Sequence, residues 1–384
     1  GVLIISSLLL QALLRKVRLP PLVVFILMGF AVRLIDMRWG IIPPAGRGVF
    51  DLLSRLGVIC LLFRVGMESD LKALLGQLRA ALGIWLPTVI VSGAAGCAVA
   101  FWGLGLPVAA SLFVGVAMTA TSVGIGVRPW QEAGALRSRN GELLLDVAEL
   151  DDISGVVLMA LLFAVAPMLG PETGQQAEAA DLVRTLLFVL VRLSVLGAAY
   201  YLFSRYIEER FTRFFERLER APGVMLTVIG TAFVMAAIAG LLGFSVAIGA
   251  FFAGIVFSRD PEAVRSRASF DSIYDLFVPF FFIGIGMLLD PSSVIPSLGI
   301  GAVFLAAAVA GKYIGAWAPA RAVTGSRGAV LIGVSMVPRA EITMIIMQAG
   351  LSLGAWAVPA RVYGGMVVVS MATCSRFTRS TSVA

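Results

Sequence analysis

Long apolar runs recur along the whole sequence, and they limit the folds that this chain can adopt. Most runs have the length that an α-helix needs to cross the hydrocarbon core of a bilayer, about 20 residues. Only 14% of the 384 residues are charged, whereas a soluble domain carries about 25%. Inside a bilayer every backbone polar group must be paired internally, so such runs form helices. The sequence therefore predicts an all-α polytopic membrane protein.

The apolar runs number thirteen, and the loops between them carry an uneven charge. Loops after odd-numbered runs, together with the C-terminal tail, hold twenty Lys and Arg residues, whereas the other loops hold five. Cytoplasmic loops are enriched in these residues, so we expect the N-terminus outside and the C-terminus in the cytoplasm. The net charge of +7 therefore does not indicate nucleic-acid binding. The approximate runs are 1–14, 20–36, 50–68, 79–104, 107–126, 144–169, 181–205, 222–242, 244–258, 275–290, 293–320, 327–352 and 355–375; the first is short, as in a trimmed chain.

The residue types that are missing or rare narrow the chemistry further. The chain has no His, so a proton carrier within it must be a carboxylate, Lys or Tyr. Its cysteines, Cys60, Cys97 and Cys374, fall singly in apolar runs. This placement predicts neither a disulfide framework nor a zinc site, and we expect no bound cofactor.

Two of the runs are predicted to break, and they occupy corresponding places in the two halves. The run 107–126 contains Thr119-Ala-Thr-Ser-Val-Gly-Ile, and the run 327–352 contains Pro338-Arg-Ala-Glu. They are seven runs apart, which suggests two repeats of opposite orientation. Paired interrupted helices in such repeats mark a transporter's binding site. We expect a first repeat over 1–180, a linker helix with a cytoplasmic extension over 181–221, and a second repeat over 222–384. Within the linker, the charged stretch Arg205–Arg220 is expected to form a cytoplasmic or interfacial helix.

Two adjacent carboxylates lie in the middle of the run 144–169. Asp152 is eight residues from the inner end of this run, so about 12 Å deep at the helical rise. Lys312 has the same predicted depth in the run 293–320. A charged side chain at membrane depth needs a partner, so we expect Lys312 to pair with Asp151 or Asp152. Spacing alone leaves open which of the two aspartates it takes.

This set of groups suits competition between a proton and a small hard cation. Na⁺ or Li⁺ prefers oxygen ligands, which the aspartates and the hydroxyls of Thr119, Thr121 and Ser122 could supply. Asp146 and Glu149, closer to the cytoplasmic mouth, are expected to attract cations or to be solvated rather than to coordinate.

Three arginines and one acid lie outside this set of ion ligands. Arg339 and Glu341 would either form an ion pair that holds the second broken helix or act directly. Arg64 is expected to snorkel toward the membrane surface. The sequence offers no explanation for Arg192, in the middle of the run 181–205.

Other functions remain open at this point. K⁺/H⁺ exchange would use the same groups, and a non-transporting membrane sensor is a further alternative. An intramembrane aspartyl protease also has two membrane aspartates, but it needs them facing one another from different helices. Here they are neighbours on one helix, and Gly284-Ile-Gly-Met-Leu-Leu-Asp places Asp290 too late for a Gly-x-Gly-Asp signature.

Taken in order, these motifs resemble those of the monovalent cation:proton antiporters, the family that includes the bacterial sodium/proton antiporters NapA and NhaA. The resemblance covers most of the chain. The matching pieces are Leu56-Gly-Val-Ile-Cys-Leu-Leu-Phe-Arg-Val-Gly-Met-Glu-Ser-Asp, the Thr119 break, Asp151-Asp152, Ile248-Gly-Ala-Phe-Phe-Ala-Gly, Phe277-Val-Pro-Phe-Phe-Phe-Ile-Gly-Ile-Gly-Met, Lys312 and Pro338-Arg-Ala-Glu.

The resemblance implies a fold and a role for each aspartate. It implies thirteen helices, inverted repeats, two crossing broken helices in a core domain beside a dimerisation domain, and elevator-like alternating access in a homodimer. It implies that Asp152 binds the ion or proton and that Asp151 forms a switchable ion pair with Lys312. An Asp-Asp pair with Lys resembles the electrogenic members, so the expected activity is electrogenic Na⁺(Li⁺)/H⁺ exchange.

Overall fold

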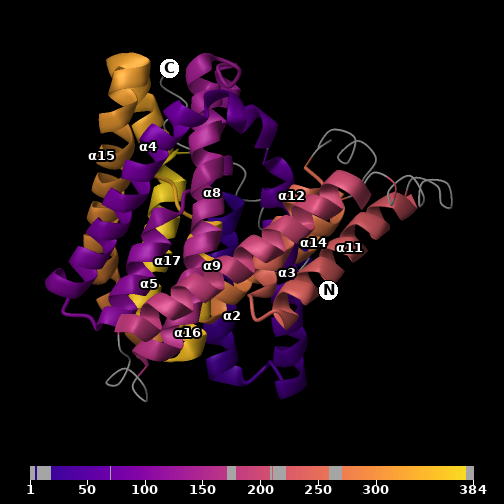
Figure 1. Ribbon diagram of the computed structural model, residues 1–384. Helices are drawn as coiled ribbons and strands as arrows, with labels where there is room; N and C mark the ends of the chain where they lie inside the picture. Colours follow the sequence, from indigo (N-terminus) through magenta and orange to yellow (C-terminus); the bar gives the residue numbers. More distant parts are fainter. Residues whose placement is uncertain are drawn as a thin grey trace. The chain divides into compact units, whose positions relative to one another are not determined.

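The computed structural model describes residues 5–6, 19–69, 71–170, 179–207, 210, 222–258 and 270–377. In this part of the chain the regular elements are all helices (Figure 1). Each predicted apolar run after the first coincides with a helix or a broken pair of helices; the run 1–14 and most of Arg205–Arg220 lie outside the described residues. The longer elements are α2 (Pro21–Trp39), α3 (Pro44–Glu68), α4 (Leu71–Ala98), α5 (Val108–Thr119), α8 (Arg139–Val165), α9 (Ala179–Leu202), α11 (Pro222–Leu241), α12 (Val246–Val256), α14 (Phe270–Met287), α15 (Val294–Ser335), α16 (Glu341–Leu353) and α17 (Ala360–Phe377).

Short helices continue or connect the long ones. The π-helical turns η2 (Val99–Gly103) and η4 (Phe203–Ile207) extend α4 and α9. The others are α6 (Val123–Gly126), α7 (Arg128–Glu132), η3 (Ala166–Leu169) and η5 (Pro291–Ser293). By length and composition alone, five helices of the described part could cross a membrane, or six if the bent pair α5 and α6–α7 is one span.

Two helical paths are interrupted, at the two predicted places. The first path leaves helical geometry at Ala120–Ser122 and bends by 43° between α5 and α6–α7. The second leaves it between Ser335 and Glu341, around Pro338. The boundary expected between the runs 293–320 and 327–352 differs: it is a kink inside α15 at Gly325, whose φ of 72° lets a single residue redirect the chain.

The chain divides into two compact units. One comprises Gly1–Trp39, Lys72–Ala177 and Ile285–Ala384, and the other Gly40–Leu71 and Glu178–Gly284. In the first unit α15 lies along α17, α16 lies against α5 and α17, and both α5 and α15 contact α8. This unit contains both interrupted paths. The division does not test the inverted repeats 1–180 and 222–384, which stay a prediction.

The second unit is built on α3 and α12, which approach closely. A side chain on Gly66 of α3 would collide with the Phe251 carbonyl of α12, so small residues allow this contact. Arg64 is held by Glu68, 3.0 Å from its Nε, and lies 4.4 Å over the Tyr274 ring. These contacts hold its charged group on the surface of the unit.

Arg192, whose role the sequence leaves unexplained, also lies in the second unit. It is exposed on α9, with its guanidinium 4.2 Å over the Phe188 ring. Its Nη1 donates a 3.5 Å hydrogen bond to the Leu242 carbonyl, where α11 has just ended. Arg192 thus joins α9 to the turn between α11 and α12.

Candidate ion-binding site

The two helix breaks contact each other directly. The Ser122 amide donates to the Pro338 carbonyl over 2.8 Å, and the Thr121 hydroxyl donates to the Met336 carbonyl over 3.2 Å. Interrupting a helix leaves backbone groups without their usual partners, and each break satisfies groups of the other. The two paths therefore cross at their non-helical segments.

Lys312 and Asp151 form an ion pair inside the first unit. Lys312 Nζ donates to Asp151 Oδ2 over 2.6 Å, and both side chains are 0% exposed. Gly311 and Gly315 flank the lysine and let α15 approach the α4 backbone, so that a Cβ at either would lie 2.9–3.0 Å from an α4 Cα. Lys312 is thus placed by close packing of small residues. The second oxygen of the pair, Asp151 Oδ1, is buried and makes no hydrogen bond within the described residues.

Asp152 follows on α8, turned about 100° from Asp151 around the helix axis. It is also buried, with 6% of its surface exposed, and it interacts electrostatically with Lys312. Glu149 and Asp146 precede it at three-residue steps, so the three acids follow one side of α8. Asp146 is only 5% exposed, so it is not the solvated group that the sequence allowed.

The three predicted hydroxyl ligands differ in how they are used. The Thr119 hydroxyl donates to the Val116 carbonyl one turn back on its own helix, over 2.8 Å, and the Thr121 hydroxyl donates to the Met336 carbonyl at the crossing. Ser122 Oγ is buried and makes no hydrogen bond within the described residues. A buried hydroxyl without a partner costs free energy, so Ser122 is the hydroxyl best suited to take a ligand.

Arg339 supports the crossing through carbonyl groups. Its side chain is fully buried and donates to the Met118 and Ala120 carbonyls at the end of α5, and over 3.1 Å to the Ala308 carbonyl of α15. A cation is favourable at a helix C-terminus, where the carbonyls carry partial negative charge. Glu341 is the first residue of α16, where an acidic side chain is favourable for the opposite reason.

Two polar contacts near the site could not be identified from the sequence. The Trp85 indole donates to Ser154 Oγ over 3.0 Å, and the Ser154 hydroxyl donates to the Asp151 carbonyl over 2.9 Å. The Trp130 indole donates to Ser335 Oγ over 2.9 Å, which ties α7 to the end of α15. Both indole hydrogen bonds join residues distant in sequence, and no local sequence pattern indicates them.

Comparison with known proteins identifies the family. Residues 2–382 match the family described as "Sodium/hydrogen exchanger, transmembrane". The chain belongs to the sodium/hydrogen exchanger family. It is an integral membrane protein of a family of cation/proton antiporters, which are transporters and not enzymes, so the aspartyl protease alternative is discarded.

Individual relatives of this exchanger are distant but cover most of it. The high-affinity Na⁺/H⁺ antiporter NhaS3 of Synechocystis is 27% identical over 82% of this chain and 68% of its own length. The Na⁺/H⁺-K⁺ antiporter GerN of Bacillus cereus is 30% identical over 79% of this chain and 75% of its own length. The solved structure of the sodium proton antiporter MjNhaP1 from Methanocaldococcus jannaschii has the same fold, with a TM-score of 0.71 over 98% of this chain and 94% of its own, at 14% identity.

Proposed function

We propose that the protein is an electrogenic antiporter that exchanges Na⁺ or Li⁺ for H⁺. The proposal is carried by the buried Lys312–Asp151 ion pair, with Asp152 beside it on the same helix and two crossing helix breaks in the same unit. Uncompensated charge at membrane depth is costly. A carboxylate kept there is therefore more consistent with ion handling than with structural support alone.

The aspartates have separate roles in this proposal. Asp151 is committed to Lys312 over 2.6 Å, so Asp152 is the carboxylate that exchanges a proton for the cation. Ser122 supplies a neutral oxygen, and Thr119 and Thr121 can add lone pairs although their protons are engaged. Asp146 and Glu149 form the approach to Asp152 along α8. Arg339 holds the crossing together and does not itself bind the cargo.

Alternating access follows from competition at this site. A proton on Asp152 displaces the cation, and a cation displaces the proton, so the loaded site can face either side in turn. A charged empty site would cross the membrane poorly, which enforces exchange. We further propose that the inverted repeats, the core and dimerisation domains, the elevator-like movement, the homodimer, and the outside N-terminus and cytoplasmic C-terminus of the resembling antiporters apply to this chain.

Purified protein in liposomes with an imposed pH gradient tests the proposal. Addition of Na⁺ or Li⁺ should dissipate the gradient, and Asp152→Asn should abolish this effect. Lys312→Ala should alter charge movement, measured with a potential-sensitive dye, more than it alters exchange. Absence of Na⁺- or Li⁺-dependent proton movement, or its persistence in the Asp152→Asn variant, would overturn the proposal.

K⁺/H⁺ exchange is the second candidate. GerN, whose name includes both Na⁺ and K⁺, is 30% identical to this chain. The same site could accept K⁺ if its oxygens allow a larger cavity. Repeating the liposome assay with K⁺ distinguishes the two, since a response to K⁺ at concentrations where Na⁺ and Li⁺ give none would select K⁺/H⁺ exchange.

A further inference from the structure

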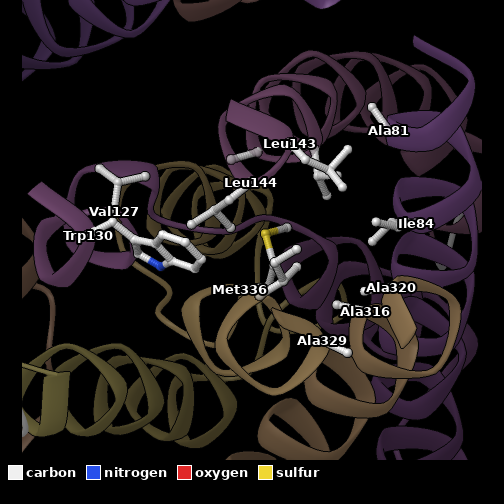
Figure 2. Packing of buried hydrophobic residues seen from close by; sticks show 13 residues of the cluster. Ala81, Ile84, Val127, Trp130, Leu143, Leu144, Ala316, Ala320, Ala329 and Met336 are labelled. Atoms are coloured by element: carbon white, nitrogen blue, oxygen red, sulfur yellow. The ribbon is translucent and has the colours of Figure 1, made fainter. Parts of the chain in front are cut away.

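A cluster of apolar side chains lies next to the buried ion pair in the first unit. Figure 2 shows Leu144, Trp130 and Met336 converging from α8, α7 and the end of α15, with Ile84 and Ala316 on the other side. All of its members are nearly or fully buried. The cluster consists of Ala81, Ile84, Val127, Trp130, Leu143, Leu144, Val147, Ala148, Ala316, Ala320, Ala329, Ile332 and Met336.

The positions of the cluster residues along α8 and α15 place the cluster next to the ion pair, on the side where α8 begins. Val147 and Leu144 precede Asp151 by four and seven residues, so they share its face of α8 at about 6 and 10 Å along the axis. Ala316 and Ala320 follow Lys312 by four and eight residues, at about 6 and 12 Å on α15. On both helices, two apolar turns therefore separate the ion pair from the end of the unit at which α8 begins.

The other side of α8 has the opposite character over the same length. Asp146 and Glu149 precede Asp152 at three-residue steps there, whereas Leu144 and Val147 of the cluster lie on the face of Asp151; the cluster also includes Ala148, four residues before Asp152. One helix therefore carries acidic side chains on one side and the apolar residues that precede Asp151 on another. Since Asp151 and Asp152 are adjacent in sequence, they lie at nearly the same depth, and they differ in the face of α8 that each occupies.

The cluster is also closed by a specific contact on its far side. The indole of the cluster residue Trp130 donates to Ser335 Oγ, and Gly126 lets α6 approach the Ser335 carbonyl so closely that any side chain would collide. These contacts hold α6 and α7 of the first broken path against the end of α15 in the second.

We infer that this cluster is a seal that keeps water and protons away from the Asp151–Lys312 pair, so that ions reach the site only along the Asp152 side of α8. The inference rests on the proposed antiport function and extends it: it names the residues that prevent proton leak without cargo. Water within the cluster would offer protons a path to the pair that bypasses Asp152.

Paired substitutions on α8 test the seal. Leu144→Asn puts a polar group of similar size into the cluster, and Leu162→Asn makes the same change at a buried α8 position outside it. We expect Leu144→Asn to speed proton entry into cation-free liposomes about ten-fold, which corresponds to a barrier lower by about 1.4 kcal/mol. Leu162→Asn should leave this rate at that of the unaltered protein.

Milder variants keep the test decisive if the asparagine variants do not fold. Val147→Thr and Val156→Thr add one hydroxyl each at fully buried α8 positions, and only Val147 belongs to the cluster. Equal leak within each matched pair overturns the seal. Cation-driven exchange by the unaltered protein is measured in the same vesicles; its absence overturns the antiport proposal, whereas its presence with equal leak in all variants overturns the seal alone.

Discussion

Removing Lys312 should destabilise the protein strongly, and removing both charges of its ion pair should not. The pair is fully buried, with 2.6 Å between Lys312 Nζ and Asp151 Oδ2. Removing one partner of a buried pair leaves the other charge uncompensated and costs about 3–5 kcal/mol. Replacing both partners by neutral groups of similar size is often close to neutral in free energy.

The expected shift in melting temperature follows from the length of the chain. At about 2.1 cal/mol/K per residue, 384 residues give an unfolding entropy of about 0.8 kcal/mol/K. Lys312→Gln should therefore lower Tm by about 4–6 °C. In the double variant Asp151→Asn/Lys312→Gln, two amides can hydrogen-bond in place of the ions, and Tm should return to within about 2 °C of the parent.

The assay is thermal unfolding in detergent, followed by the fluorescence of a dye that reacts with thiols as they become exposed. Cys374 is fully buried and reports on the first unit, which contains the ion pair. The exposed pair Arg128–Glu132 supplies a control: its side chains are 59% and 46% exposed, so Arg128→Gln should lower Tm by no more than about 1 °C. Additive losses in the double variant would refute the reasoning, as would equal losses for Lys312→Gln and Arg128→Gln.

Three further substitutions, two of them paired with a control substitution, test the crossing itself. Ser122→Ala should raise the half-saturating Na⁺ concentration about 2- to 10-fold in the liposome assay, since one oxygen contact is worth about 0.5–1.5 kcal/mol. Thr119→Val should raise this concentration less. A larger effect of Thr119→Val than of Ser122→Ala would contradict the ligand assignment. Gly126→Ala should lower the free energy of unfolding by about 1–3 kcal/mol, seen as a lower Tm, because the new Cβ would meet a backbone carbonyl of α15. Gly124→Ala, on the same short helix with open space around it, should be neutral or stabilising; equal effects of the two would contradict the close approach. Arg339→Lys should lower thermal stability although it keeps the charge, because a lysine cannot reproduce the forked donors that reach several carbonyls; an unchanged Tm would show that charge alone matters.

The sequence was informative where a residue is costly in a membrane. Lys312 and the aspartates could be matched in depth because each would be unstable alone, and the structure pairs Lys312 with Asp151. Pro338 and the Thr119–Ser122 stretch indicated the breaks because they disfavour continuous helix, and both breaks are present. These signals are local or depend on helical rise, which is nearly constant.

Contacts between side chains that are distant in sequence could not be predicted from these local signals. The sequence suggests an ion pair between Arg339 and Glu341 because they are two residues apart, whereas Arg339 donates to the Ala120 and Ala308 carbonyls, which are distant in sequence. The Trp130–Ser335 bond joins residues 205 positions apart. Ser122 could not be separated from Thr119 and Thr121, since all three have the same chemistry and only their partners differ.

The charges at the crossing also limit how exchange could be electrogenic. Replacing one proton by one Na⁺ on Asp152 moves no net charge, so a second group must change its protonation state during the cycle. Arg339 does not qualify, because a guanidinium remains protonated and this one is held by carbonyls.

We propose that this second group is the Lys312–Asp151 ion pair, which lies next to Asp152. If so, the double variant Asp151→Asn/Lys312→Gln should still exchange Na⁺ for H⁺ but without net charge movement. The measurement compares exchange rates in liposomes with the membrane potential clamped at zero and at an imposed value by K⁺ and valinomycin. The parent should respond to the potential and the double variant should not; a variant that responds as the parent does would place the second titrating group elsewhere.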